Sequence, residues 1–341
     1  MIREAIAGLV IGRDLPEEEM VAVMEEIMGG QATPAQIAAF LTALRIKGET
    51  VAEISGAAMV MREKATPVTV FADDRVLVDT CGTGGDASGT FNVSTAAAFV
   101  VAGAGVPVAK HGNRSVTSQC GSADVLEALG VDLGLGADAI GRCVRQVGIG
   151  FLFAPALHGA MKHAIGPRRE IGIRTIFNIL GPLTNPARAN VQVLGVFTPS
   201  LTEPLALVLG RLGSRRALVV CGEGNLDEIT VTGSTRVSEW HDNSLTTYTI
   251  HPGDVGLATA TLAEIRGSAT PAAAAGQLRE VLAGTPGPCL DMVLFNAGAA
   301  LLAAGRSRDL AAGVELARKV VADGAALKKL DALVAFCRSG Q

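Results

Sequence analysis

Residues 76–130 read VLVDTCGTGGDASGTFNVSTAAAFVVAGAGVPVAKHGNRSVTSQCGSADVLEALG, and this stretch decides the fold. It opens with a short apolar run, which a glycine-rich loop follows over 81–89. An alanine-rich segment from about Val93 predicts a helix, and a second apolar run at 106–109 leads into the polar sequence KHGNR at 110–114. Strand, loop, helix, strand and loop follow one another in the order that a βαβ unit requires.

The charge pattern of this stretch predicts an anion site. No Asp or Glu occurs over 87–123, whereas Lys110 and Arg114 are fixed cations. The loop glycines let the backbone approach a ligand and turn its N–H groups toward it. The polar run 92–95 stands at the predicted helix start, where free N–H groups and the positive end of the helix dipole attract anions. A tight turn beside an ordinary helix cap is the alternative, but two such loops at neighbouring strand ends favour a phosphate or pyrophosphate site.

The composition excludes several classes of protein. The chain has 341 residues, enough for one large domain or two, and a formal net charge of −4, which argues against nucleic acid as a partner. The longest apolar runs are broken by Gly, Pro or Asn, so we expect no membrane span. Arg3 and Glu4 near the N-terminus, without a long apolar core after them, argue against a secretory signal. We therefore expect a cytoplasmic protein.

The cysteines support the same compartment. Six are scattered along the chain without a C-x-x-C pair, so a zinc ribbon or a thioredoxin motif is not indicated. Free thiols of this kind fit a reducing environment. Cys81 and Cys120 flank the predicted anion site, and we interpret them as small packing residues because no general base accompanies them in the sequence.

The chain before the glycine loop has a helical pattern. Apolar residues recur at helical spacing over 17–28, 34–47 and 51–64. Thr33-Pro34 and Thr50 are suitable helix starts. Three such helices predict a small helical subdomain, which could also pair with a second copy through an apolar face; the pattern alone does not separate the two.

From residue 76 onward, strands and helices alternate. Strands are expected at 76–78, 106–109, 150–153, 191–196, 217–221 and 247–250, and helices at 123–129, 139–147, 156–163 and 201–212. Further helices follow residue 271. Such alternation is typical of a mostly parallel central sheet flanked by helices. The predicted class is α/β, with a helical subdomain at 1–70 and a larger domain at 71–341.

The middle of the chain, 151–186, is rich in cations. Most of them fit a solvated helix face, but Arg168 follows Gly166-Pro167, which we interpret as a turn that holds the guanidinium rigidly. Arginine grips a planar carboxylate with two hydrogen bonds. A second predicted turn, at Gly181-Pro182, would supply a stiff apolar wall.

A pair of adjacent acids follows the apolar run 217–221. Asp227 and Glu228 offer hard oxygen ligands at a strand end. Mg²⁺ in proteins commonly takes one or two carboxylates together with water and substrate phosphates. Two solvated loop acids are the alternative, but an acid-free pyrophosphate loop elsewhere in the chain favours a metal.

Together these regions closely resemble the anthranilate phosphoribosyltransferases. The similarity runs nearly from end to end, and the combination is far more specific than any one piece. The matching segments are 81–86 (CGTGGD), 92–95 (NVST), 110–114 (KHGNR), 121–130, 151–155, 168–186, 226–229, 296–302 and 323–330.

The resemblance implies a reaction and an assembly. Phosphoribose would pass from phosphoribosyl pyrophosphate to the amine of anthranilate with release of pyrophosphate, and Mg²⁺ would be the cofactor. It also implies a homodimer built through the N-terminal helices, with part of about 160–185 packing against those helices.

The resemblance also implies site residues. Metal ligands would be Ser94, Asp227 and Glu228. Anthranilate would contact Gly82, Asn113, His158 and Arg168, with Pro182 against its ring. Contacts to phosphoribosyl pyrophosphate would come from Gly82, Gly85, Asp86, Thr90, Asn92, Val93, Ser94, Thr95, Lys110, His111, Gly112, Asn113, Arg114, Ser115, Val116, Thr117, Ser118 and Ser122. The departures from the family pattern are few: Gly159 where Pro is frequent, and Thr117 and Cys120 where Ser is common, which concerns the shape of side pockets.

Three rival functions remain to be compared. A nucleoside phosphorylase of similar architecture uses related glycine loops, but the KHGNR run and the acid pair favour a metal-bound pyrophosphate donor. A dinucleotide-dependent dehydrogenase fits G-x-G-x-x-A at 82–87, yet the acid expected about 20 residues later is missing and Lys110 lies near its place. A binding-only relative would lack the acid pair or the arginine clamp, and this chain has both.

The chemistry requires no acid–base residue. The amine of anthranilate is a neutral nucleophile that needs placement more than deprotonation. We therefore assign electrostatic roles to Lys110 and Arg168 and no general base.

Overall fold

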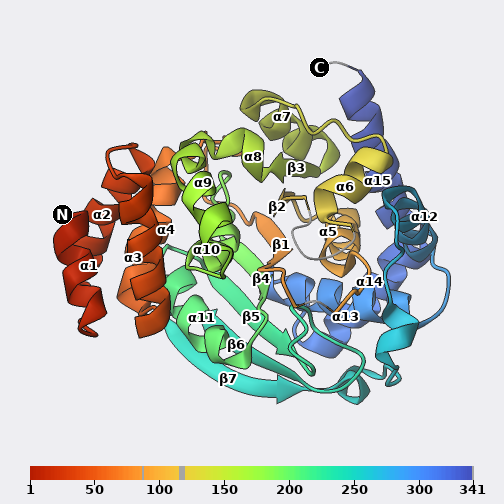
Figure 1. Ribbon diagram of the computed structural model, residues 1–341. Helices are drawn as coiled ribbons and strands as arrows, with labels where there is room; N and C mark the ends of the chain where they lie inside the picture. The colour runs from red at the N-terminus through yellow and green to blue at the C-terminus, as the bar shows by residue number, and fades with distance from the viewer. Residues whose placement is uncertain (87, 115–119, 340–341) are drawn as a thin grey trace.

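The computed structural model describes residues 1–86, 88–114 and 120–339. The chain begins with four helices, α1 (Ile2–Val10), α2 (Glu17–Met28), α3 (Pro34–Lys47) and α4 (Val51–Lys64), which gather on one side of the molecule (Figure 1). Thr33 and Thr50 cap α3 and α4 by accepting from the N–H groups of Gln36 and Glu53. These reciprocal caps satisfy N–H groups that a helix start leaves free, so both predicted starts are confirmed.

A seven-stranded sheet forms the centre of the larger part of the molecule. Its strands lie in the order β3-β2-β1-β4-β5-β6-β7, with β1 to β5 parallel and β6 and β7 antiparallel. Their bounds are Val78–Gly82 for β1, Val108–Gly112 for β2, Ile149–Phe153 for β3, Val191–Gly195 for β4, Arg216–Gly222 for β5, Thr235–His241 for β6 and Ser244–Ile250 for β7. The chain order reverses between β1 and β4, which is where ligands bind in open sheets of this kind.

Helices cover both faces of the sheet, and the strand side chains alternate between two cores. On β5, Leu218 and Val220 face one core, whereas Ala217 and Val219 face the other. The first core contains α5 (Val93–Gly103) and α13 (Pro288–Ala303), and the second contains α11 (Thr202–Arg211) and the N-terminal helices. Six other helices of this larger part are α6 (Ser122–Ala128), α7 (Ala137–Val147), α8 (Ala154–Leu157), α12 (Pro271–Leu282), α14 (Leu310–Ala322) and α15 (Ala325–Arg338).

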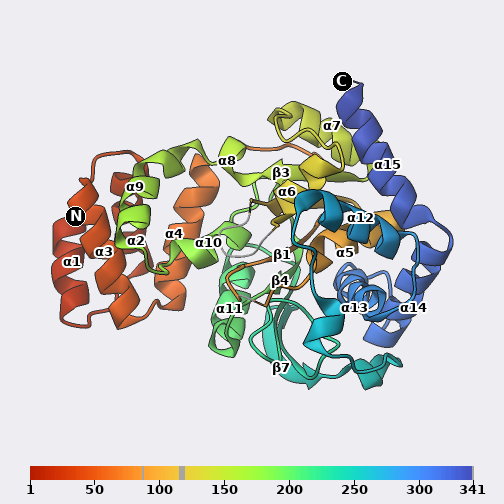
Figure 2. The ribbon, with the colours of Figure 1, turned by 45° about the vertical axis from the view of Figure 1, so that its right-hand side comes forward.

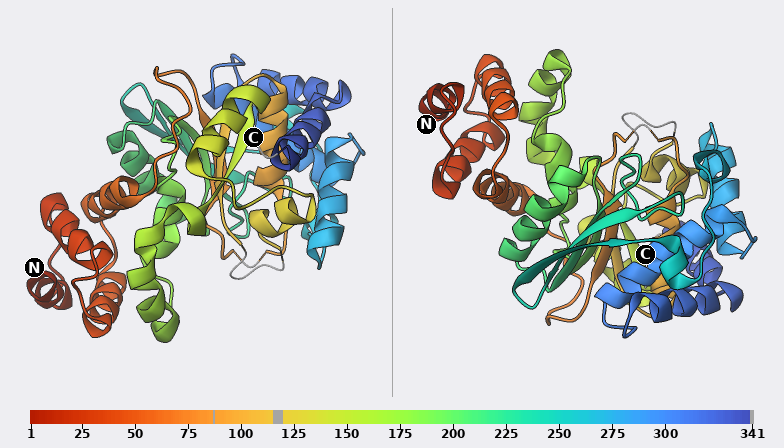
Figure 3. Two further views of the ribbon diagram at one scale, coloured as in Figure 1. Left: turned by 90° about the horizontal axis from the view of Figure 1, so that it is seen from above. Right: turned by 90° about the horizontal axis from the view of Figure 1, so that it is seen from below.

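The middle of the chain returns to the N-terminal helices. Helix α9 (Lys162–Ile171) packs against α2 and α3, and α10 (Phe177–Leu183) packs against α4. Figures 2 and 3 show α9 beside the first helices, at a distance from the chain's C-terminal helices. Arg62 of α4 ties the two parts together, because its guanidinium donates to the carbonyls of Leu183 (2.7 Å) and Leu212 (2.9 Å), at the ends of α10 and α11. Cations at helix C-termini are favourable because the dipole is negative there.

The predicted strands are mostly found, but their ends differ. The sequence pattern ends the first two strands at residues 78 and 109, whereas β1 continues to Gly82 and β2 to Gly112. The reason is non-local: β1 pairs with β4 from Val78 to Gly82 and β2 pairs with β3 as far as Gly112. The polar residues at these strand ends are thereby buried, which a hydrophobicity pattern does not predict.

Strand β6 is missing from the sequence prediction, and β7 begins before its predicted start. The two strands form a hairpin whose turn residues Asp242 and Asn243 have φ values of 49° and 58°. Adjacent Asp and Asn residues between runs of β-branched and aromatic residues are a hairpin signal. That signal could have located β6.

Two predicted turns are wrong. Gly166-Pro167 lies inside α9, and Gly181-Pro182 lies inside α10. Both helices pack against other parts of the molecule, and this packing outweighs the local helix-breaking tendency of proline. In the part of the chain that the structure describes, no helix combines the length and the apolar character that crossing a membrane would take.

Candidate functional site

The glycine loop leaves the carboxyl end of β1 and meets the acidic loop after β5. Gly84 and Gly85 have φ values of 66° and 78°, which favour glycine. The N–H of Gly84 donates to Oδ2 of Asp227 at 2.7 Å. A Cβ atom at Gly82 would collide with the Asp227 side chain, and one at Gly195 with its backbone. Glycine at both strand ends therefore lets the acid lie directly on the sheet edge.

The start of α5 meets the second acid. The N–H of Ser94 donates to Oε1 of Glu228 at 3.1 Å, and the carbonyl of Ser94 accepts from the Thr80 hydroxyl at 2.8 Å. The hydroxyls of Thr83 and Thr95 are buried and have no hydrogen-bond partner among the described residues. Unpartnered buried hydroxyls are costly. They suit a site whose ligand supplies the missing acceptor.

Lys110 is buried at the end of β2, with 3 % of its surface exposed. Its Nζ donates to the carbonyl of Thr80 at 2.6 Å and lies 3.4 Å from Oγ of Ser94. Burial lowers the pKa of Lys110, and the nearby carboxylate of Asp79 opposes that change. The ammonium group is thus held between β1 and the start of α5, where a cation can contribute to the predicted anion site.

The two acids carry raised pKa values. Burial is the first cause for both; Asp86 adds to the effect on Asp227, and Asp227 adds to the effect on Glu228. Crowded carboxylates of this kind repel one another, and a bound cation relieves the repulsion. Among the described residues, no group of three His, Cys, Asp or Glu side chains could hold a metal alone. Two carboxylates and a hydroxyl, from Asp227, Glu228 and Ser94, are hard oxygen donors of the kind that Mg²⁺ takes together with water and substrate phosphates, so this donor set fits Mg²⁺.

A buried histidine pair lies beside this cluster. The Nε2 atoms of His111 and His158 are 3.2 Å apart, so one ring donates and the other accepts. Burial lowers the pKa of His111 to about 3, with a further contribution from His158, and lowers that of His158 to about 4. Both rings are neutral near pH 7. The pair joins β2 to the segment that follows α8.

Arg168 lies on helix α9, which packs against the N-terminal helices α2 and α3. Its guanidinium lies 5.0 Å from the centre of the Phe177 ring, and burial lowers its pKa. A partly desolvated guanidinium over an aromatic ring is well placed to bind a planar carboxylate. The side chain is held by helix α9 and not by a turn.

Other predicted site residues have different surroundings. Arg114 is 46 % exposed and forms ion pairs with Asp124 (2.9 Å) and Glu127 (2.8 Å). Ser122 donates to the carbonyl of Asn113 at 3.3 Å. Ser115, Val116, Thr117 and Ser118 lie outside the described residues.

The remaining loop residues surround the glycine turn. Asp86 accepts from the N–H of Ser88, and the hydroxyls of Ser88 and Thr90 are 3.1 Å apart. Asn92 donates to the carbonyl of Cys120. Val93 is fully buried, so only its backbone could face a ligand.

The sequence analysis gives no role to several residues of this region. Arg174 donates to the carbonyl of Gly85 and lies 4.3 Å from the centre of the Phe197 ring, so it joins the glycine loop to the middle segment. Asp79 and Asn185 are buried and hydrogen-bonded to each other, and Asp79 also accepts from the N–H of His111. Buried polar residues give no periodic signal, although Asn185 belongs to a segment that carries the family resemblance.

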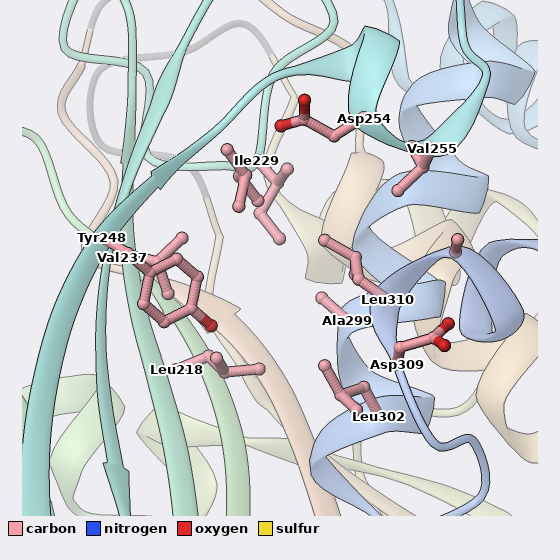
Figure 4. A pocket seen from close by; sticks show the side chains of 12 residues that line it. Leu218, Ile229, Val237, Tyr248, Asp254, Val255, Ala299, Leu302, Asp309 and Leu310 are labelled. Atoms are coloured by element: carbon pink, nitrogen blue, oxygen red, sulfur yellow. The ribbon is translucent and has the colours of Figure 1, made fainter.

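A separate cavity has a different character. It has a volume of about 310 Å³ and lies between the sheet and helices α13 and α14 (Figure 4). Leu218 and Tyr248 line it from the strands, and Leu302 and Leu310 from the helices. It contains no cationic side chain, so the polar cluster at the strand ends is the better candidate for anion chemistry.

Comparisons with known proteins place the whole chain in one family. Residues 3–65 match the helical bundle domain of a glycosyl transferase family, and residues 74–327 match its a/b domain. An anthranilate phosphoribosyltransferase of Desulfotalea psychrophila is 64 % identical over 98 % of this chain and 97 % of its own.

Two solved structures have the same overall fold. The crystal structure of the enzyme of this name from Thermus thermophilus has a TM-score of 0.92, with 46 % identity over 98 % of this chain and 99 % of that one. The enzyme of this name from Saccharomyces cerevisiae, in complex with phosphoribosyl pyrophosphate and Mg, has a TM-score of 0.89, with 28 % identity over 99 % of this chain and 98 % of that one.

Proposed function

Because this chain belongs to the anthranilate phosphoribosyltransferase family of glycosyl transferases, we propose that it transfers 5-phosphoribose from phosphoribosyl pyrophosphate to the amine of anthranilate. The products are N-(5-phosphoribosyl)anthranilate and pyrophosphate, and the reaction is the second step from chorismate to tryptophan. One observation carries the proposal: the glycine loop, the start of α5 and a buried lysine meet two adjacent carboxylates.

The donor binds at the ends of β1 and β2. The N–H groups of Gly84 and Ser94 hold Asp227 and Glu228, and the other N–H groups of the loop and of the helix start bind the donor's anionic oxygens. The unpartnered hydroxyls of Thr83 and Thr95 support this placement. Bound Mg²⁺ supplies charge neutralisation of the leaving pyrophosphate. Asp227, Glu228 and Ser94 would hold it, and Lys110 adds a fixed positive charge from the protein.

The acceptor approaches from the middle segment. Arg168 binds the carboxylate of anthranilate and so directs the neutral amine toward C1 of the ribose. His158, Asn113 and Gly82 complete the acceptor site, with Pro182 as an apolar wall. As the bond from C1 to the pyrophosphate oxygen breaks, the bond from C1 to nitrogen forms, and the chain stabilises the separating charges. The nitrogen, now positively charged, then releases one proton to water or to the departing pyrophosphate, so no general base from the protein is required.

The assembly and the compartment follow from the same family. We propose a homodimer through the N-terminal helices, supported by large apolar side chains that are exposed there: Val10 (71 %), Ile11 (81 %) and Ile46 (82 %). We propose a division of the chain near residue 70, with the middle segment joined to the first part in space. A cytoplasmic location is supported by the six unpaired cysteines.

A direct assay tests the function. The protein is mixed with Mg²⁺, phosphoribosyl pyrophosphate and anthranilate, and the loss of anthranilate fluorescence and the release of pyrophosphate are followed together. We expect equal amounts of both. Cleavage of a pyrimidine nucleoside by free phosphate, without anthranilate consumption, would instead indicate a phosphorylase.

The acid pair provides a control for the metal. Replacing Asp227 with Asn and Glu228 with Gln in one variant should cost roughly 2–4 kcal/mol of transition-state stabilisation, the loss typical of a positioned electrostatic group. Turnover is measured over a Mg²⁺ titration. Full activity of this variant would place the metal elsewhere.

A further inference from the structure

A buried carboxylate lies directly below the candidate site and has no role in the reaction described above. Asp79 of β1 is fully buried. Its Oδ1 accepts from the backbone N–H of His111 at 3.1 Å, and its Oδ2 accepts from the side-chain amide of Asn185 at 2.8 Å. The same amide nitrogen donates to the carbonyl of Ala109 at 2.8 Å, and the Asn185 oxygen accepts from the N–H of Ala187. Each polar atom of the two side chains is therefore used.

These bonds replace part of a β-ladder. Strands β1 and β2 are paired in register at Val78 and Val108, whereas β1 and β4 stay paired as far as Gly82. Past Val78, the carbonyl of Ala109 accepts from the Asn185 side chain and the N–H of His111 donates to the Asp79 side chain. The Asp79–Asn185 pair thus sets the spacing between the two strand ends.

The spacing has a consequence for the reactive groups. The carbonyl of Thr80 accepts from Nζ of Lys110, and this ammonium group also reaches Ser94. His111, whose N–H is fixed by Asp79, contacts His158 through its ring. A shift of β2 relative to β1 would therefore move Lys110 relative to Thr80 and Ser94, and it would move His111 at the same time.

Charge supports the same assignment. Burial raises the pKa of Asp79 to about 6, while Lys110 lowers it. A buried carboxylate with one cation nearby is expensive to retain and often contributes little to stability compared with apolar packing. A role in holding the neighbouring residues of the site in position explains this buried carboxylate better than a contribution to stability does.

We propose that Asp79 and Asn185 act as a positioning pair that fixes the separation of the β1 and β2 ends and thereby places Lys110 and His111 for phosphoribosyl transfer. This inference rests on the proposed function. Neither residue touches a substrate in it; both act through the residues that they hold.

The test compares Asp79→Asn and Asn185→Ala with a matched control, Asn190→Ala. Asn190 forms a similar bridge at the opposite end of β1, where its side chain accepts from the N–H of Leu77 (3.0 Å) and donates to the carbonyl of Arg75 (3.1 Å). Each variant is assayed for kcat, for both KM values and for the free energy of unfolding in urea. The control separates a loss of stability from a loss of placement.

We expect kcat to fall roughly 10–100-fold for both site variants, the effect of a small misplacement of reacting groups, with both KM values changed less than about threefold. The double variant should lose no more than the worse single variant, because the two residues act as one unit. Asn190→Ala should lose stability and keep kcat. If the site variants keep kcat, or if Asn190→Ala loses as much kcat as they do at a similar loss of stability, the inference is refuted while the wild type remains active. An inactive wild type would refute the proposed function and this inference with it.

A second measurement covers variants that fail to fold. A crystal structure of the wild-type protein with Mg²⁺ and phosphoribosyl pyrophosphate should keep the Asp79 carboxylate within about 3.5 Å of the His111 N–H. A structure in which this bond is broken while the donor is bound would refute the positioning role.

Discussion

The end of β2 and the loop beyond it carry two cations four residues apart, and their surroundings differ. Lys110 is 3 % exposed and bonds to Thr80 and lies near Ser94 inside the candidate site. Arg114 is 46 % exposed and is paired with Asp124 and Glu127. In the sequence the two residues are equivalent members of one acid-free run. The difference teaches that a cation's role depends on which acids the fold places beside it: Asp79 and Glu228 lie near Lys110, and Asp124 and Glu127 near Arg114.

The largest effect is expected for Lys110, the buried cation of the two. Lys110→Met should lower kcat/KM by roughly 10²–10³-fold, because it removes a desolvated positive charge at the leaving group. The measurement is steady-state kinetics at saturating Mg²⁺. Lys162→Met, an exposed lysine on α9, is the control and should keep wild-type kinetics. A Lys110 variant less impaired than the Arg114 variant described below would break the comparison.

Burial should also make the stability of the protein depend on pH, through the histidine pair His111 and His158. Folded His158 has a pKa near 4, below its ordinary value of 6.5, so the unfolded chain binds more protons between these values. Its contribution to stability is complete above pH 6.5 and is lost as pH falls toward 4. Between pH 7.5 and 5.0 this loss should be about 2 kcal/mol, calculated from the two pKa values.

Urea unfolding of the wild type and of His158→Gln at both pH values measures this loss. The variant should show a pH dependence weaker by about that amount. An equal pH dependence in both proteins would mean that His158 is not held neutral by burial.

Arg168 is intermediate in burial and should be intermediate in effect. Arg168→Ala should raise the KM for anthranilate roughly 10–100-fold, the value of a charge-assisted hydrogen bond, and leave the KM for the donor nearly unchanged. Arg168→Lys should recover only part, because an ammonium group lacks the planar fork. Arg169→Ala, next to it and exposed, is the matched control. Unchanged anthranilate kinetics would remove the clamp assignment.

The smallest effect is expected for Arg114, the exposed cation. Arg114→Gln should change the donor KM less than about threefold, because exposed ion pairs contribute little and are screened by salt. Kinetics at low and high salt measure it. A donor KM raised more than tenfold would show that Arg114 leaves its acids to bind the donor, as the family resemblance implies.

Local chemistry made much of the site predictable. The glycine loop, the start of α5 at Asn92 and the acid pair after β5 are found where the sequence places them, because turns, caps and short apolar runs depend on neighbouring residues. The helical bounds of α2, α3 and α4 also agree, because the apolar spacing of all three and the caps of α3 and α4 lie within single segments. The cooperation of loop and acids was expected because an acid-free pyrophosphate loop favours a metal and therefore metal ligands elsewhere in the chain.

The remaining features depend on contacts between distant segments. Arg168 was assigned to a turn, yet packing against α2 and α3 keeps Gly166-Pro167 helical. The hairpin of β6 and β7 was half missed, although its Asp-Asn turn was visible. The Asp79–Asn185 pair joins residues 106 positions apart, and no local pattern reports such a bond.

By itself, the sequence determined the class of fold, and it predicted the loops that we propose to bind anions and the pair of acids that we propose to bind the metal. Only the tertiary structure decided where β1 and β2 end, which cation is buried and what holds the two strand ends apart. The physical reason is that the first group depends on backbone conformations and periodicities within a few residues. The second depends on hydrogen bonds and burial that exist only once distant strands have paired.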